Sequence, residues 1–330
     1  MTVHGLVDLE VALPGGTVDI GEVAARAGVP LADALRITHC RRFPALGPGE
    51  RSVDVALHAA RTLLKRTAVD VDGIDLVLWA GSAEWDVPFW SPAAHVAGEL
   101  GITGAHCFEV ANFCNAGSTA LQIGLDRLAL GRAGSVLVVM ADRLSTMLDQ
   151  DDPMSKELFN FGDAAAVALL GPDPLFTVPA SRMRTDPDWS SYYHGEYRDD
   201  RLVIRREAHR SGLASAYVAN FTALTADVLD ALGRTVDDVD WFLINHGDRD
   251  MHVRLLGELG IPGSRSVFNY DHLAHMGASD TLIALRGLLD DDALRPGDLL
   301  LLATSAMGFS WGITALRYEG GGHDGPGGRR

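Results

Sequence analysis

Hydrophobic residues in this chain occur in short, nearly continuous runs and in longer segments with helical spacing. The runs 74–80 and 135–141 are apolar almost throughout, which is typical of strands buried on both faces of a parallel sheet. Segment 52–66 repeats its apolar residues every three to four positions, which predicts a helix. The pattern predicts further strands at 5–13, 164–170, 201–205, 241–245, 299–303 and 308–318, and further helices at 20–27, 31–36, 92–100, 214–232, 250–259 and 282–289.

Strands and helices alternate along the whole chain, which predicts a layered α/β architecture. The turn signal Gly171-Pro172-Asp173-Pro174 is the clearest punctuation and predicts a boundary between two halves, 1–172 and 173–318. Both halves alternate strand and helix around buried strands, although no residue-level repeat is visible. Residues 319–330 are Gly-rich and offer no apolar residue to bury, so we expect a disordered tail there.

Composition and charge narrow the function. Of the 330 residues, 47% are hydrophobic and 22% are charged, which fits a soluble globular protein with a large core. The net charge of −16 argues against nucleic acid as a partner, because a phosphate-binding surface needs clustered Lys and Arg. Three cysteines without paired spacing favour a reducing compartment. Neither a signal peptide nor a membrane span is recognisable, so we expect a cytoplasmic protein.

The stretch 108–121 carries the most informative chemistry. It reads as a buried strand that turns sharply at Cys114 and continues as a helix to about residue 130. A thiol at a helix N-terminus faces unpaired N–H groups and the positive end of the helix dipole, which favour the nucleophilic thiolate. Ala116, Gly117 and Ser118 follow, so a substrate carbonyl can approach the backbone closely. A buried structural cysteine is the alternative for an isolated Cys.

Five segments in fixed order resemble the thiolase superfamily, specifically its β-ketoacyl-ACP synthase III branch. They are 108–117 around the cysteine, 161–166, 244–246, 275–280 and 307–312. Together they cover nearly the whole chain. The resemblance implies a five-layered αβαβα thiolase fold with two duplicated halves, and normally a homodimer. It also implies acyl transfer through a cysteine thioester, with acyl-CoA or acyl-carrier protein as the donor.

By this resemblance, Cys114 matches the acylated nucleophile and His246 matches the catalytic histidine. A histidine there can take a proton from an incoming nucleophile or polarise a thioester carbonyl, which contributes ~10²–10⁴ in rate; a buried structural histidine is the alternative. Met307 falls where the family pairs a backbone N–H with that of Cys114 as an oxyanion hole. The chain reads Ser-Ala-Met-Gly at 305–308, where the family usually has consecutive glycines, so the pocket shape is left open.

The third catalytic position departs from the family. His275 aligns with the asparagine of condensing enzymes, and Asp280 follows in a His-x-Gly-x-x-Asp segment. That segment resembles a divergent group of natural-product acyltransferases with a Cys-His-Asp triad. An aspartate beside His246 would orient the imidazole as a base and repel a malonyl carboxylate. Two alternatives stay open: Asp280 as a dipole partner of the 282–289 helix, and His275 as a donor in a condensing enzyme.

Further candidates surround this centre. An aromatic loop follows the 74–80 strand, and we expect it at or near a homodimer interface because exposed aromatic clusters are seldom left in water. Its residues are Trp85, Phe89 and Trp90, and the same substrate-pocket or interface group includes Asn115, Gly308 and Phe309.

Arginines at 205–210 are candidates for docking an acidic carrier protein, with a solvated charge cluster as the alternative. They are Arg205, Arg206 and Arg210. Asp163, in a Gly-Asp turn, is interpreted as structural. The chain has no Walker loop, no Rossmann glycine fingerprint and no metal-ligand spacing. We therefore expect no metal and no tightly bound redox cofactor.

These observations predict a ketosynthase III-like acyltransferase of secondary metabolism. Cys114 would accept an acyl group from acyl-CoA or a phosphopantetheinyl carrier protein and pass it to a small-molecule hydroxyl or amine. The alternative is a decarboxylative β-ketoacyl synthase, priming or condensing, that uses a malonyl thioester. A third reading is a non-catalytic thiolase-fold partner subunit. The acyl chain, the type of donor, the acceptor, the pathway and the choice between Asp280 and His275 as third catalytic residue stay open.

Overall fold

The computed structural model describes residues 2–321, so residues 322–330 of the predicted tail lie outside the described part of the chain. The strands are β1 (His4–Ala12), β2 (Thr17–Asp19), β3 (Arg42–Pro44), β4 (Leu76–Gly81), β5 (His106–Ala111), β6 (Val136–Ala141), β7 (Ala165–Pro172), β8 (Phe176–Thr185), β9 (Tyr193–Arg198), β10 (Arg201–Arg206), β11 (Trp241–Ile244), β12 (Leu299–Ala306) and β13 (Ser310–Tyr318). The α-helices are α1 (Ile20–Ala27), α2 (Leu31–Thr38), α3 (Ser52–Thr67), α4 (Pro92–Leu100), α5 (Ala116–Ala129), α6 (Leu213–Leu232), α7 (Arg249–Leu259) and α8 (Asp280–Asp290).

Nine strands are hydrogen-bonded in the order β11-β12-β13-β8-β1-β7-β6-β4-β5. The junction between β1 and β8 is short, with only Gly5 opposite Thr177 and Leu6 opposite Phe176. On either side of it the pairing repeats. The series β1-β7-β6-β4 runs antiparallel, antiparallel, parallel, and β8-β13-β12-β11 does the same. The topology therefore contains the duplication that the residues do not display.

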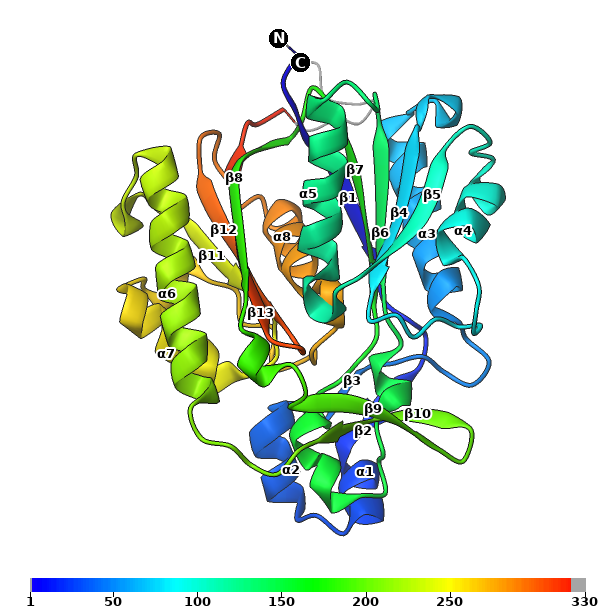
Figure 1. Ribbon diagram of the computed structural model, residues 1–330, viewed down its shortest axis with the longest axis vertical. Helices are drawn as coiled ribbons and strands as arrows, with labels where there is room; N and C mark the ends of the chain where they lie inside the picture. The colour runs from blue at the N-terminus through cyan, green and yellow to red at the C-terminus, as the bar shows by residue number, and fades with distance from the viewer. Residues whose placement is uncertain (1, 322–330) are drawn as a thin grey trace.

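Helices separate and cover the two half-sheets (Figure 1). α3 and α4 pack outside the first half-sheet, and α6 and α7 pack outside the second. α5 and α8 lie between the half-sheets, where the largest core cluster joins residues of both helices to strands of both half-sheets. This sequence of helix and sheet layers confirms the predicted five-layered α/β fold. It also places the start of α5 and the start of α8 in the same central layer.

A smaller group of elements lies at one end of the half-sheets, at the bottom of Figure 1. It contains the two-stranded sheets β2-β3 and β9-β10 together with α1 and α2. One core cluster joins Phe43 of β3 to Phe159 and to Met276, which is next to His275. This packing stabilises the chain segments around Phe159 and Met276. Within the described residues, no helix is long and apolar enough to cross a membrane.

Several features differ from the prediction. The sequence pattern marked no strand at β2, β3 or β9. β8 was not expected, because only Phe176 is fully buried along it and Pro179 interrupts any alternation of apolar and polar residues. The tail was expected to be disordered from Glu319. However, the N–H of Glu319 donates to the carbonyl of Leu175 at 2.9 Å, and the Glu319 carboxylate accepts from Thr177 Oγ1 at 2.6 Å. The start of β8 therefore holds the chain one residue beyond the predicted limit.

Candidate active site

Cys114 lies in the tight connection between β5 and α5. A 3₁₀ turn over Phe113–Asn115 joins them, and Phe113 has a φ of 48°, in the left-handed region that bulky residues seldom adopt. Such strain persists where the surrounding structure fixes the backbone. A Cβ on Gly117 would lie 2.7 Å from Met140 Sδ, so glycine is required for α5 to pack this closely on β6. The sequence thus places a buried thiol at the start of the central helix.

His275 is the side chain in hydrogen-bond contact with this thiol. Its Nε2 lies 3.0 Å from Cys114 Sγ, and both residues are buried. The main chain of His275 is held on both sides: its N–H donates to the carbonyl of Asn160 at 2.7 Å, and its carbonyl accepts from Gly162 at 3.0 Å. The ring also packs edge-on against Phe161, 5.3 Å between centroids. The imidazole is therefore fixed beside the nucleophile.

Asp280, the first residue of α8, is the second partner of this imidazole. Its Oδ2 lies 2.5 Å from His275 Nδ1, its Oδ1 accepts from the N–H of Met276 at 2.8 Å, and Oδ2 also accepts from the N–H of His246 at 2.7 Å. The turn that brings His275 back onto Asp280 passes through Gly277, with a φ of 63°. A Cβ there would lie 2.6 Å from Asp142 Oδ2, which explains the glycine of the His-x-Gly-x-x-Asp segment.

The ring of His246 occupies a different place from the one we expected. Asp280 was expected to orient it, but His246 Nδ1 is 4.0 Å from Asp280 Oδ1, and only the main-chain N–H of His246 reaches the carboxylate. His246 Nε2 accepts from the N–H of Asn269 at 3.4 Å, and the ring packs on Tyr270. Within residues 2–321, no hydrogen bond joins His246 to Cys114. The carboxylate holds His275 instead because the Gly277 turn folds that ring onto it.

The electrostatics of the buried site follow from these contacts. Burial alone would lower the pKa of His275, but the adjacent Cys114 and Asp280 raise it well above its ordinary 6.5. Burial would raise the pKa of Asp280, but His275 and the N–H donors hold it below its ordinary 3.8. Burial lowers the pKa of His246, which keeps that ring neutral. The site thus places a charged imidazole between the cysteine sulfur and the carboxylate, in hydrogen-bond contact with both.

These shifts predict a pH-dependent stability. The contribution of Asp280 is complete above its ordinary pKa of 3.8 and is lost as the pH falls through the lower folded value. That of His275 is complete below 6.5 and is lost as the pH rises through the higher folded value. The free energy of unfolding, measured with urea, should therefore differ most between wild type and Asp280→Asn from about pH 3.8 to 6.5. A difference independent of pH would contradict the ion pair.

Known proteins match both halves of the chain. Two family models, described as 3-oxoacyl-[acyl-carrier-protein (ACP)] synthase III and as its C-terminal part, match residues 108–187 and 229–318. A Streptomyces coelicolor protein named beta-ketoacyl-[acyl-carrier-protein] synthase III 3 is 30% identical over 284 residues, which cover 82% of this chain and 84% of that protein. The chain belongs to the 3-oxoacyl-ACP synthase III family.

Two further comparisons extend along nearly the whole chain. The beta-ketoacyl-[acyl-carrier-protein] synthase III of Rhizorhabdus wittichii is 28% identical over 309 residues, which cover 93% of this chain and 97% of that protein. The crystal structure of 3-oxoacyl-(acyl carrier protein) synthase III from Pseudomonas aeruginosa has a TM-score of 0.86 at 22% identity, and the match covers 96% of this chain and 99% of that one. The predicted thiolase-fold, ketosynthase III-like architecture is confirmed.

The β12–β13 hairpin adjoins the nucleophile in this synthase III-family chain. Asn115 Nδ2 donates to Ser310 Oγ at 2.7 Å. Gly308, in the turn, has a φ of 83°, and a Cβ there would lie 3.7 Å from the ring of Phe113. Among the described residues, the N–H of Met307 has no backbone acceptor. The hairpin turn thus lies beside the Phe113–Asn115 turn that carries Cys114, and the oxyanion role of the Met307 N–H stays a prediction.

Phe309, by contrast, is part of an aromatic cluster behind the turn. It is buried, with the rings of Trp189, Tyr192, Tyr193 and Tyr217 about 6 Å away between centroids. Its ring therefore supports the hairpin from the side of α6. The expected pocket group divides accordingly: Asn115 belongs to the Cys114 turn, Gly308 lies against that turn, and Phe309 packs into the core that holds the hairpin.

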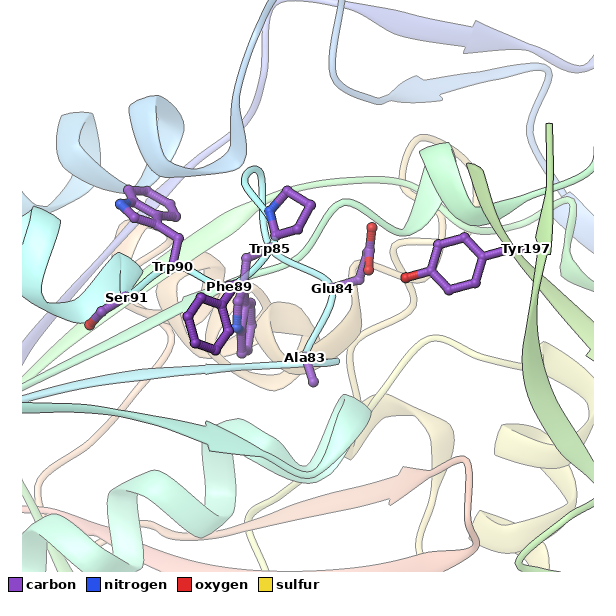
Figure 2. A pocket seen from close by; sticks show the side chains of 8 residues that line it. Ala83, Glu84, Trp85, Phe89, Trp90, Ser91 and Tyr197 are labelled. Atoms are coloured by element: carbon purple, nitrogen blue, oxygen red, sulfur yellow. The ribbon is translucent and has the colours of Figure 1, made fainter. Parts of the chain in front are cut away.

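The aromatic loop after β4 lines a surface cleft of about 520 Å³ (Figure 2). Trp85 packs edge-on against Trp79, 6.4 Å between centroids, and Trp90 packs on His95 at 5.0 Å, so neither tryptophan is freely exposed as the sequence suggested. Phe89 is fully exposed, with a φ of 53°. Figure 2 shows Tyr197 of β9 on the other side of this cleft. Only Phe89 of the loop presents its whole ring to the outside.

We predict that this exposed ring lies at the interface of a homodimer. Sedimentation at micromolar concentration should give the mass of a dimer, and Phe89→Glu should shift it towards monomer because the charge would have to be buried. Leu130→Glu is the matched control, since Leu130 is an exposed apolar residue at the far end of α5. A wild-type monomer, or equal effects of both variants, would contradict the prediction.

The arginines proposed for carrier-protein docking make contacts within the chain. The Arg205 side chain is only 13% exposed and donates to Asp149 Oδ2 at 2.7 Å and to Asp152 Oδ2 at 2.9 Å. Arg206 pairs with Glu157, and Arg210 lies over the ring of Trp189, 3.9 Å from its centroid. Arg205 is thus neither a free docking cation nor part of a solvated cluster, because two carboxylates already neutralise it.

Arg205 is therefore expected to act in stability. Arg205→Ala removes the buried partner of the Asp149 and Asp152 carboxylates, although Asp149 keeps the exposed Arg198, and should lower the free energy of unfolding by about 1.5–3 kcal/mol. The KM for a carrier-protein donor should stay unchanged. Urea denaturation and donor kinetics check both parts, with Arg201→Ala as the control, because Arg201 is exposed on the same strand. A raised KM without loss of stability would restore the docking role.

Proposed function

We propose that this enzyme transfers an acyl group from a CoA or carrier-protein thioester to a hydroxyl or amine, through an acyl-Cys114 intermediate. The observation that carries the proposal is the continuous contact from Asp280 Oδ2 through the imidazole of His275 to Cys114 Sγ, with distances of 2.5 and 3.0 Å. A nucleophile, a base and a carboxylate that orients the base are the components of acyl transfer. The base role, which the sequence argument gave to His246, is assigned here to His275.

Loading begins when the Cys114 thiolate attacks the thioester carbonyl. A carbon–sulfur bond forms, and the negative charge moves to the carbonyl oxygen, where the N–H groups of Cys114 and Met307 would stabilise it. As the tetrahedral intermediate collapses, the bond to the CoA or carrier thiol breaks. The departing sulfur takes the proton of the His275 imidazolium, which leaves His275 neutral and Cys114 acylated.

Transfer reverses the proton movement. Neutral His275 accepts the proton of the acceptor O–H or N–H while the oxygen or nitrogen attacks the acyl carbon. Cys114 then leaves as a thiolate beside the re-formed imidazolium. Asp280 stabilises this charged ring without taking its proton. His246 does not move a proton in this scheme; its N–H instead helps to hold Asp280.

A decarboxylative β-ketoacyl synthase remains the second candidate, because the relatives compared above are named as such synthases. Decarboxylation of a malonyl thioester needs neutral donors near its carbonyl and no anion near its carboxylate. The buried Asp280 carboxylate is an unfavourable neighbour for that group. The complete Cys114–His275–Asp280 contact likewise argues against a non-catalytic partner subunit.

The deciding experiment offers pre-acylated enzyme three acceptors in parallel: malonyl thioester, alcohols and amines. Mass spectrometry of the products distinguishes β-ketoacyl thioesters from esters and amides. Esters or amides support the proposal, and β-ketoacyl products alone overturn it. We place this acyltransferase in secondary metabolism in the cytoplasm, as a homodimer that takes acyl groups from CoA or carrier-protein thioesters. An enzyme that never becomes acylated would be a partner subunit.

A further inference from the structure

Asn160 connects the two histidine-bearing segments of the site. It lies just before the Phe-Gly-Asp turn that leads into β7, with 5% of its surface exposed. Its main-chain carbonyl accepts from the N–H of His275 at 2.7 Å, and its side-chain Nδ2 donates to the carbonyl of Gly247 at 2.6 Å. Because Nδ2 faces a carbonyl oxygen, the orientation of the amide is determined by its partner.

These hydrogen bonds form a closed ring that includes Asp280 and His275. From Asn160 the path runs to Gly247, and the preceding residue His246 donates its N–H to Asp280 Oδ2 at 2.7 Å. The same oxygen lies 2.5 Å from His275 Nδ1, and the N–H of His275 returns to the carbonyl of Asn160. Asn160 precedes β7 in the first half-sheet, whereas the other members of this ring of hydrogen bonds come from the second half of the chain.

We propose that Asn160 is a positioning residue that keeps Asp280 and the His275 ring in line with Cys114. Gly247 is exposed, so without the Asn160 amide its carbonyl can turn to water and the loop after β11 is free to move. The N–H of His246 would then withdraw from Asp280, and that carboxylate would hold the His275 ring less firmly. A small displacement of an oriented base lowers the rate strongly, because acyl transfer requires aligned reacting groups.

The sequence gives a physical reason to examine this position. Asn160 stands between Phe159 and Phe161 in a largely apolar segment, where burial of an amide is unfavourable unless it is hydrogen-bonded. Its Oδ1 is buried and has no partner among the described residues. An apolar residue would fill this place without leaving an unpaired oxygen. The bond to Gly247 is the interaction that the amide provides and an apolar side chain cannot.

The test measures the Cys114–His275 pair directly, with no acyl substrate. The rate of Cys114 alkylation by iodoacetamide is followed across pH in Asn160→Leu and in Asn160→Ala, both in a Cys107→Ala background. Loss of the Asn160–Gly247 hydrogen bond should lower the alkylation rate about tenfold at the acidic end of the pH range. The pH profile of the rate should then move towards that of His275→Ala. Single-turnover transfer from acylated enzyme should fall about tenfold, while the KM for the donor stays the same.

Asp163→Asn is the matched structural control. Asp163 lies on the same segment and is buried, but its carboxylate accepts from the N–H groups of Leu46 and Ser145 and, within the described residues, makes no hydrogen bond with either histidine. This variant should lower thermal stability without moving the alkylation profile. Unchanged profiles in folded Asn160 variants would overturn the positioning role, even if their stability fell. The smaller alanine variant provides the same measurement if the leucine variant does not fold.

This inference rests on the proposed function only for the identity of the reaction. If the wild-type enzyme forms no ester or amide but the alkylation profile of the Asn160 variants shifts, the proposed acceptor class is wrong and the positioning role stands. If esters or amides form and the Asn160 variants keep both the wild-type profile and rate, the positioning role is wrong and the function stands.

Discussion

Cys114→Ala should abolish covalent acylation and reduce acyl transfer by at least ~10⁴-fold. The reason is that the proposed reaction passes through a thioester on this sulfur. Among residues 2–321, the imidazole of His275 has no other nucleophile within hydrogen-bond distance. Wild-type protein incubated with acyl-CoA or an acyl-carrier protein should gain the mass of one acyl group. The variant should keep its original mass. Intact-mass spectrometry before and after incubation measures the difference directly.

The other two cysteines provide the control for this experiment. Burial, and then the nearby Asp271, raise the pKa of Cys40 to about 11, so it is seldom a thiolate at neutral pH. Burial and then Glu109 raise the pKa of Cys107 as well. Cys107→Ala should therefore load an acyl group as the wild type does. Acyl label retained by Cys114→Ala, at Cys40 or Cys107, would refute the assignment of the nucleophile.

The fold could be predicted from the sequence because its strongest signals are local. Continuous apolar runs marked β4 and β6 as buried strands, and helical spacing marked α3, which the structure places over the first half-sheet. The two half-sheets could not be read in the same way. Their duplication appears only in the pairing of strands far apart in sequence, such as β1 with β7. β8 escaped notice because only Phe176 is fully buried along it and its exposed residues do not alternate with buried ones.

The candidate site shows the same limit. The position of Cys114 at a strand-to-helix turn follows from neighbouring residues, so it could be recognised in the sequence. The partner of this thiol could not, because Cys114 and His275 are 161 residues apart and meet only through the packing of α5 against the start of α8. Whether Asp280 holds His275 or His246 depends on the left-handed backbone of Gly277. That conformation is a property of the folded turn.

Asp280→Asn distinguishes the proposed acyl transfer from the alternative, decarboxylative condensation. In the proposed transferase, the neutral asparagine side chain cannot stabilise the imidazolium of His275. Its NH₂ group would also face one of the N–H groups that donate to the Asp280 carboxylate in the wild type. Transfer to a hydroxyl or amine should fall by up to ~10⁴, as when a triad carboxylate is removed in other enzymes. Loading should fall less, because the thiol stays at the N-terminus of α5 and the oxyanion donors are untouched.

His275 provides the complementary substitution. His275→Asn recreates the asparagine of condensing enzymes at this position and removes the base, so transfer to an alcohol or amine should be lost together with the acid-side reactivity of Cys114. Far-ultraviolet circular dichroism and thermal melting show whether each variant is folded. In a decarboxylating synthase the order is different: His275→Asn keeps activity with malonyl thioester, and Asp280→Asn removes only a helix-dipole partner that contributes ~0.3–1 kcal/mol.

The transfer step must be measured alone for this comparison. Enzyme acylated on Cys114 is freed of donor, mixed rapidly with acceptor and quenched at intervals, and the loss of the acyl mass gives the rate. Because loading is complete before mixing, a slower reaction of Asp280→Asn reports on the base and not on the nucleophile. A wild-type transfer rate in Asp280→Asn would exclude the Cys114–His275–Asp280 mechanism. A large loss of the transfer rate in Asp280→Asn, together with a smaller loss in His246→Ala, would assign the role of base to His275.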